Sequence, residues 1–238
     1  MNTSELHQTT VSDIVCSNYH AAGVFREYGI DFCCGGDITL REACERKGIS
    51  TEEVSGKLLD ALEKREASDE QFQDWSPGLL IDYIESRHHR FVRQKVYEIA
   101  DYAKKVAHVH GQRHPWNITI YQDFLELSED MLDHLEEEEK KVFPLIRKIE
   151  EMSNKGAAID ADTVKKLHDG LELLHEDHEG AGNLMASIRQ ASNGFTPPDD
   201  ACTKYRILYK NLAGFEEDLH KHVHLEKNLL FRKAQALV

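Results

Sequence analysis

Two stretches of the sequence repeat a histidine and a glutamate four residues apart. The segment DHLEEEEKKVFPLIRK contains His134 and Glu138, and the segment KHVHLEKNLLFRKAQA contains His222 and Glu226. Residues at this spacing lie on the same face of an α-helix, so an imidazole and a carboxylate can bind a single metal ion. Each stretch therefore predicts half of a binuclear metal centre.

Helical phase selects one more inward-facing histidine in each of two other segments. In an amphipathic helix, the positions three, four and seven residues from an inward position are mostly apolar. His88 meets this condition, whereas the neighbours of His89 are polar or charged, so we expect His89 to face solvent. His178 lies on an apolar stripe and is preferred to His175, which begins its own His-x-x-x-Glu but has acidic neighbours.

The predicted ligand set combines four imidazoles with two carboxylates. Its members are His88, His134, Glu138, His178, His222 and Glu226. This set is too large for one tetrahedral zinc ion, and two ions that share bridging carboxylates fit it better. Mixed nitrogen and oxygen ligands in a helix bundle favour iron, and manganese stays open. Any one histidine could instead be an ordinary core residue, but two buried glutamates without a cation would be costly.

Long helices must position these residues. From Ser76 onward, capping residues, proline and glycine predict four helices joined by short connections, which is typical of an antiparallel four-helix bundle over residues 76–238. Asn117 and either Asp160 or Asp162 are expected to cap the second and third helices. Pro144 lies inside the second helix, so we expect a kink one or two turns after Glu138.

The first part of the chain has a different pattern. Residues 1–66 predict a small separate domain with helices of ten to fifteen residues, and the polar stretch 67–75 predicts a linker. The turn DFCCGG carries Cys33 and Cys34, of which at least one should be accessible to ligate metal, accept NO or exchange thiols. The alternative is a glycine turn with one buried cysteine. The remaining cysteines, Cys16, Cys44 and Cys202, are expected to be structural.

Composition excludes several classes of protein. The formal net charge of −14 opposes binding to nucleic acid or to an anionic membrane surface. No apolar run approaches the roughly 20 residues that cross a bilayer, and the N-terminus resembles no export signal. We therefore expect a soluble cytoplasmic protein with reduced thiols.

These segments together resemble one family over nearly the whole chain. The blocks VFREYGIDFCCGGDITLREAC, RHH, HLEEEEKKVFP, EDHEGAGNLM and HVHLEKNLLF are similar to those of the RIC family (repair of iron centres), which joins a cysteine-bearing domain to a haemerythrin-like HHE bundle. The resemblance implies a carboxylate-bridged di-iron centre on the six predicted ligands. It also implies a functional role for Cys33 and Cys34. Two departures from the family pattern are His89, where aspartate is usual, and Arg232, where proline is usual.

The resemblance implies protection or rebuilding of iron–sulfur clusters damaged by nitrosative or oxidative stress, through iron donation or NO removal. Reduction of NO to N2O at the di-iron centre is linked to the family, so whether this chain is an enzyme stays open. Damaged iron–sulfur proteins would be its partners, and a homodimer is compatible with the resemblance. The alternative is a haemerythrin-like carrier or sensor of O2 or NO. A binuclear hydrolase is disfavoured because the sequence offers no dedicated general base.

Overall fold

The computed structural model describes residues 3–33, 35–63 and 72–238. Within these ranges the chain is helical, and its only extended pairing is an isolated antiparallel bridge between Thr10 and Thr39. The chain divides into two compact units, one formed by Met1–Ser76 with Val223–Lys233 and the other by Pro77–His222 with Ala234–Val238. Among the described residues, no helix is both long enough and apolar enough to span a membrane. The predicted all-helical fold is confirmed.

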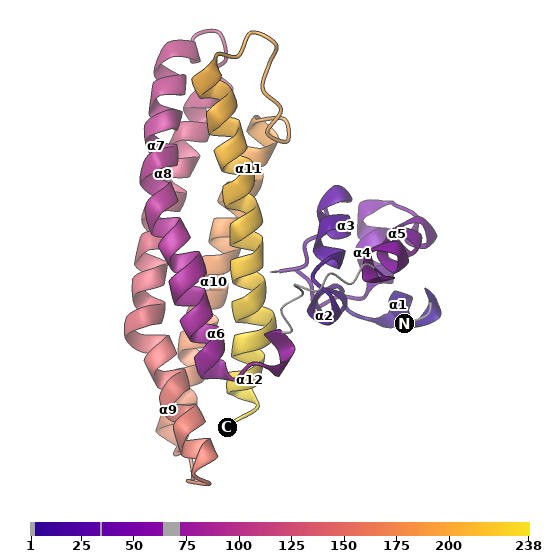
Figure 1. Cartoon of the computed structure of the whole chain (residues 1–238), viewed down its shortest axis with the longest axis vertical. Helices are drawn as coiled ribbons and strands as arrows, with labels where there is room; N and C mark the ends of the chain where they lie inside the picture. Colours follow the sequence, from indigo (N-terminus) through magenta and orange to yellow (C-terminus); the bar gives the residue numbers. More distant parts are fainter. Residues whose placement is uncertain (1–2, 34, 64–71) are drawn as a thin grey trace. The chain divides into compact units, whose positions relative to one another are not determined.

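Short helices form the N-terminal part of the chain (Figure 1). They are α1 (Thr3–Gln8), α2 (Val11–Ser17), α3 (Ala21–Glu27), α4 (Leu40–Lys47), α5 (Thr51–Glu63) and the 3-10 helix η1 (Phe72–Asp74). Of these helices, only α5, with 13 residues, reaches the expected length of ten to fifteen residues. Thr39 and Glu42 form a capping box before α4, and Gly48 ends it in the left-handed conformation at φ +66°.

The predicted linker lies mostly outside the described residues. Its residues 67–71 are not described, and its residues 72–74 form η1 rather than an extended segment. Phe72 is buried, and its ring packs against that of Trp75 at 4.9 Å between centroids. Phe72 therefore gives the end of this polar segment an apolar contact.

Long helical rods follow (Figure 1), and the elements of residues 77–235 group into four of them. The first is α6 (Pro77–Tyr83), η2 (Ile84–His89) and α7 (Arg90–His110), and the second is α8 (Trp116–Glu137), η3 (Glu138–Val142) and α9 (Phe143–Asn154). The third is α10 (Ala161–Ala191), and the fourth is α11 (Thr203–Val223), η4 (His224–Phe231) and α12 (Arg232–Gln235). Asp160 caps α10 by accepting a hydrogen bond from the backbone N–H of Thr163, as predicted.

The expected cap at Asn117 is wrong. Asn117 lies inside α8, which begins at Trp116, and its buried side chain donates to the hydroxyl of Tyr205 at 2.7 Å. The same hydroxyl accepts a hydrogen bond from Nε1 of Trp116 at 2.9 Å. Asn117 therefore joins α8 to α11 within the core instead of capping α8.

Segments of π-helix interrupt three of the rods. They are η2, η3 and η4, and each lies beside or contains a predicted metal ligand. The kink expected after Glu138 stays a prediction; η3 begins at Glu138 and ends two residues before Pro144. A π-helical turn holds one extra residue, so it shifts the helical phase of the residues around it. A phase argument based on an ideal α-helix does not account for this shift.

The last π-segment belongs to the same compact unit as the N-terminal helices. Arg232 donates to Asp13 at 2.7 Å and to Asp37 at 2.9 Å, and the side-chain amide of Asn228 donates to the carbonyl of Phe32 at 3.2 Å. Arg232 is one of the two departures from the family pattern. The Arg232 guanidinium therefore pairs with two carboxylates, and a proline at this position could form neither ion pair.

Candidate metal centre

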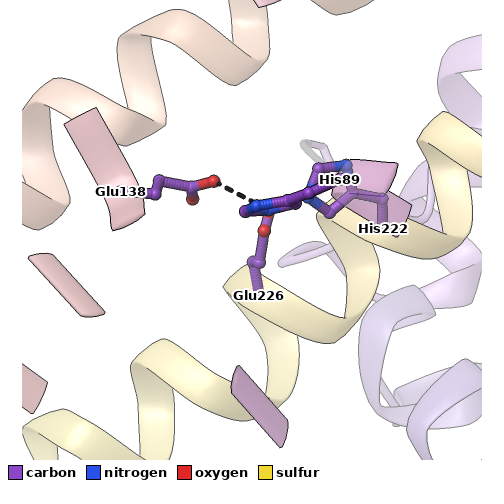
Figure 2. Close-up of side chains that lie close together, drawn as sticks. All are labelled: His89, Glu138, His222 and Glu226. Atoms are coloured by element: carbon purple, nitrogen blue, oxygen red, sulfur yellow. Dashed lines mark ion pairs between the residues drawn. The ribbon is translucent and has the colours of Figure 1, made fainter. Parts of the chain in front are cut away.

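Two clusters of histidine and glutamate lie in the interior of the chain. The first contains His89, Glu138, His222 and Glu226, and the second contains His134, Glu138, His178 and Glu226. In each cluster the four candidate ligand atoms lie within 4.8 Å of one another, and all four residues are buried. Figure 2 shows the first cluster. Because both glutamates belong to both clusters, they are placed to bridge two cations.

Glu138 is the clearest sign that a cation belongs here. Its side chain is fully buried, and its Oε2 lies 3.3 Å from Nε2 of His89 and 3.5 Å from Nε2 of His134. Neither of its oxygens accepts a hydrogen bond from the residues that the structure describes. A buried carboxylate without hydrogen bonds is costly unless a positive charge lies beside it. The geometry fits a metal ion coordinated by this carboxylate and its neighbouring imidazoles.

His134 is oriented by a carboxylate outside the cluster. Its Nδ1 lies 3.1 Å from Oδ2 of Asp177, which precedes His178 on α10. The hydrogen bond with His134 lowers the pKa of Asp177, so the carboxylate stays charged and accepts the Nδ1 proton. Nε2 of His134 then carries a lone pair directed into the cluster. This is the usual outer-sphere arrangement of a metal-bound histidine.

His89 has a corresponding outer partner. Its Nδ1 lies 2.7 Å from Oε1 of Glu139, and Arg93 donates to both oxygens of Glu139 at 2.7 and 2.9 Å. Burial alone would raise the pKa of Glu139, but the hydrogen bonds from Arg93 and His89 lower it. Glu139 therefore holds His89 from outside the cluster.

The position of His89 corrects the sequence analysis. His89 is fully buried and belongs to the first cluster, whereas we expected it to face solvent. The cause is η2, whose π-helical turn brings both His88 and His89 to the interior. His88 is also buried, but its Nδ1 lies 3.1 Å from Asp218 and it belongs to neither cluster. Ligation by His88 stays a prediction, with His89 as its competitor.

The choice of His178 agrees with the observed burial. His178 is 2% exposed, whereas the side chain of His175 is 44% exposed and lies 3.4 Å from Glu179. Nε2 of His178 lies 3.1 Å from Nε2 of His134, so the two imidazoles converge on one point. His222 and Glu226 are likewise fully buried, as helical phase predicted.

The cysteine pair is described only in part. Cys33 is buried, its backbone N–H donates to Oδ1 of Asp31 at 2.9 Å, and its thiol donates to the same oxygen at 3.2 Å. Cys34 lies outside the described residues. The expectation that one thiol of the pair is accessible therefore stays a prediction that rests on Cys34.

Three carboxylates that contact the imidazoles were not predicted from the sequence. Asp177, Glu139 and Asp218 contact His134, His89 and His88 respectively. Asp177 and Glu139 are each adjacent in sequence to a predicted ligand, and this adjacency was the available signal. Asp218 lies one helical turn before His222 on α11. Its partner, His88, belongs to η2, so this contact is visible only in the tertiary structure.

Comparison with known families agrees with this architecture. The ScdA_N family, described as a domain of unknown function, matches residues 7–62. The Hemerythrin HHE cation binding domain matches residues 79–234, which include both clusters.

Similar proteins match the chain almost end to end. The iron-sulfur cluster repair protein ScdA of Staphylococcus haemolyticus is 32% identical over 227 residues, covering 95% of this chain and 98% of that protein. A probable iron-sulfur cluster repair protein of Haemophilus influenzae is 32% identical over 94% of this chain and 95% of its own length. The iron-sulfur cluster repair protein YtfE of Dickeya chrysanthemi is 31% identical over 90% of both chains.

Proposed function

This chain belongs to the Hemerythrin HHE cation binding family and to the family of iron–sulfur cluster repair proteins, and we propose that it repairs clusters damaged by nitrosative or oxidative stress. The proposal includes a pair of iron ions in the two clusters of the bundle. The observation that carries it is that two fully buried glutamates, Glu138 and Glu226, are shared between two groups of buried histidines.

The donor set supports iron. The two clusters offer imidazole nitrogens and carboxylate oxygens, and neither contains a cysteine. Structural zinc sites are usually closed and tetrahedral, whereas carboxylate-bridged iron pairs are built from glutamates and histidines in bundle cores. Iron held in this way would bind a diatomic such as NO and could be passed to a damaged cluster.

The residues of the chain have separable roles in this proposal. Glu138 and Glu226 would bridge the two ions, and His134 and His178 would hold one of them. Asp177 keeps the proton of His134 on Nδ1, so that Nε2 stays available as a ligand. The burial of the set excludes bulk water, which strengthens the binding of the cation by the carboxylates.

The cysteine pair has a second role in the proposal. Cys33 and Cys34 would receive or deliver iron or NO between the bundle and a client, because a thiolate is a good ligand for both. The clients would be cytoplasmic iron–sulfur proteins. The net charge of −14 supports a protein client over nucleic acid.

A reconstitution experiment tests the proposal. An iron–sulfur enzyme is inactivated with NO, the NO is removed, and the iron-loaded protein is added while the activity of the enzyme is followed. We expect activity to return with the wild-type protein and not with His178→Ala. His175→Ala is the matched control, since His175 lies one turn away on the same helix and is exposed. It should restore activity as the wild type does.

The same experiment separates the proposal from the alternative function. A carrier or sensor would bind NO once per centre, consume no more, and leave the client enzyme inactive. That result, with the iron content of the protein intact, would replace cluster repair by a binding role.

A further inference from the structure

A pocket of about 830 Å³ lies at the end of the bundle that is remote from the metal centre. It is formed where α7 ends and where α8 and α11 begin, at the upper end of the bundle in Figure 1. His89 and His110 are 21 residues apart on one rod, so the pocket is about 30 Å from the centre along the helix axis. This pocket is therefore distinct from the site described above.

The pocket contains a cysteine beside a histidine. Sγ of Cys202 lies 3.3 Å from Nε2 of His110, and both residues line the pocket. Of the four cysteines that the structure describes, Cys202 is the exposed one. The helical context expected for Cys202 is not observed, because the residue precedes α11, which begins at Thr203. A thiol that can pass its proton to an adjacent imidazole is a nucleophile.

The histidine is held in place by aromatic neighbours. The ring of His110 lies 5.3 Å from that of Tyr205 and stacks on His114 at 6.1 Å between centroids. Tyr205 is itself fully buried and fixed by hydrogen bonds from Trp116 and Asn117. The imidazole is therefore positioned by the core, while the thiol remains accessible from the pocket.

The charge of the pocket is opposite to that of the chain. Three lysines line it together with a single acidic residue, Asp101. Lys105 pairs with Asp101, which leaves Lys104 and Lys204 to act on a ligand. Apolar surface is also available, since Val109 is 70% exposed and Ile118 is 45% exposed. A small organic anion fits these features, and the volume lies in the range of ligand pockets, roughly 300 to 1,000 Å³.

We propose that Cys202 and His110 form a thiol-exchange site for small disulfides that carry carboxylates. His110 accepts the thiol proton, and the Cys202 thiolate attacks one sulfur of the disulfide. The sulfur–sulfur bond of the ligand breaks, a new bond forms between Cys202 and one half, and the other half leaves as a thiolate. The leaving thiolate takes the proton from His110, and Lys104 and Lys204 bind the carboxylates.

The first test measures the rate at which each cysteine is modified. The full-length reduced protein is mixed with glutathione disulfide, quenched with acid at intervals, and analysed by peptide mass spectrometry. We expect Cys202 to form the mixed disulfide, and His110→Gln to slow this reaction at least about tenfold. His108→Gln is the matched control, since His108 lines the same pocket two residues earlier. Equal rates in His110→Gln and wild type would overturn the proposal.

The second test depends only on exposed lysines and so avoids a change in folding. Cystamine is a disulfide that carries two amines in place of carboxylates. We expect Lys104→Gln combined with Lys204→Gln to slow the reaction of Cys202 with glutathione disulfide about tenfold and to leave or raise its rate with cystamine. A wild-type protein that reacts faster with cystamine than with glutathione disulfide would contradict the proposed ligand class.

Discussion

The Nε2 atom of His89 lies 3.3 Å from Oε2 of Glu138, and both side chains are completely buried (Figure 2). The two residues come from different rods, and each lies in a π-helical segment. Their contact ties the first rod to the glutamate that both metal clusters share. Part of the centre is therefore formed by residues of the π-helical segments, whereas His134, His178 and His222 lie in α-helix.

The first prediction separates His88 from His89. Of these two histidines, only His89 brings a ring nitrogen into a cluster with Glu138. We therefore expect His89→Ala to lose a larger share of the bound iron than His88→Ala. Iron per chain is measured by elemental analysis after anaerobic purification. Loss of iron in His88→Ala with full retention in His89→Ala would return the ligand role to His88.

The second prediction concerns the charge of Glu138. Glu138→Gln keeps the shape of the side chain and removes the charge, so we expect the variant to bind less than half the iron of the wild type, since both clusters share this residue. Without metal, the same change should raise the thermal midpoint, because it removes a fully buried carboxylate that accepts no hydrogen bond from the described residues.

Glu136→Gln is the control for this prediction. Glu136 lies two residues away on α8, is exposed, and pairs with Lys140 on the surface. It should change neither the iron content nor the midpoint of the metal-free protein. A metal-free Glu138→Gln protein that melts below the wild type would show that the carboxylate has a stabilising partner other than a cation.

The third prediction concerns the buried tyrosine that joins α8 to α11. Tyr205→Phe removes the acceptor of hydrogen bonds from Trp116 and Asn117, whose distances are 2.9 and 2.7 Å. Asn117 is buried, and a buried donor left without an acceptor costs about 1–3 kcal/mol, so we expect the free energy of unfolding in urea to fall by that amount. Tyr97→Phe is the control, since Tyr97 is 68% exposed. An unchanged urea midpoint for Tyr205→Phe would be inconsistent with this role.

The fourth prediction concerns the reactivity of Cys16 as a function of pH. Burial raises the pKa of the Cys16 thiol to about 11, so only roughly one molecule in a thousand carries the thiolate at pH 8. Labelling of Cys16 by iodoacetamide should therefore be slow at pH 8 and rise about tenfold per pH unit up to the pKa. Peptide mass spectrometry measures the labelling of Cys16, and the exposed Cys202 serves as the reference thiol in the same sample. Rapid labelling of Cys16 at pH 8 would contradict the raised pKa of its thiol.

Helical phase located most of the centre from sequence. His134, His178, His222, Glu138 and Glu226 are all buried as expected, because each lies in a stretch where apolar neighbours recur with the helical period. Phase failed at His89 because η2 is a π-helix, and the local sequence carries no signal for one extra residue in a turn.

Other errors came from contacts that are distant in sequence. The packing of Asn117 against Tyr205 and of Cys202 against His110 joins residues about 90 positions apart, which no local pattern reports. Arg232 has its acidic partners, Asp13 and Asp37, nearly 200 or more positions earlier. In each case the side chain has a role that only the tertiary structure reveals.

The central claim is that the bundle holds two bridged iron ions on buried histidines and glutamates. The most direct test is the iron content of the anaerobically purified wild-type protein and of the double variant His134→Ala/His222→Ala, with Mössbauer spectra of the wild type. We predict about two irons per chain in an exchange-coupled pair for the wild type, and none in the variant. An unchanged iron content in the variant, or a single uncoupled iron in the wild type, would contradict the account.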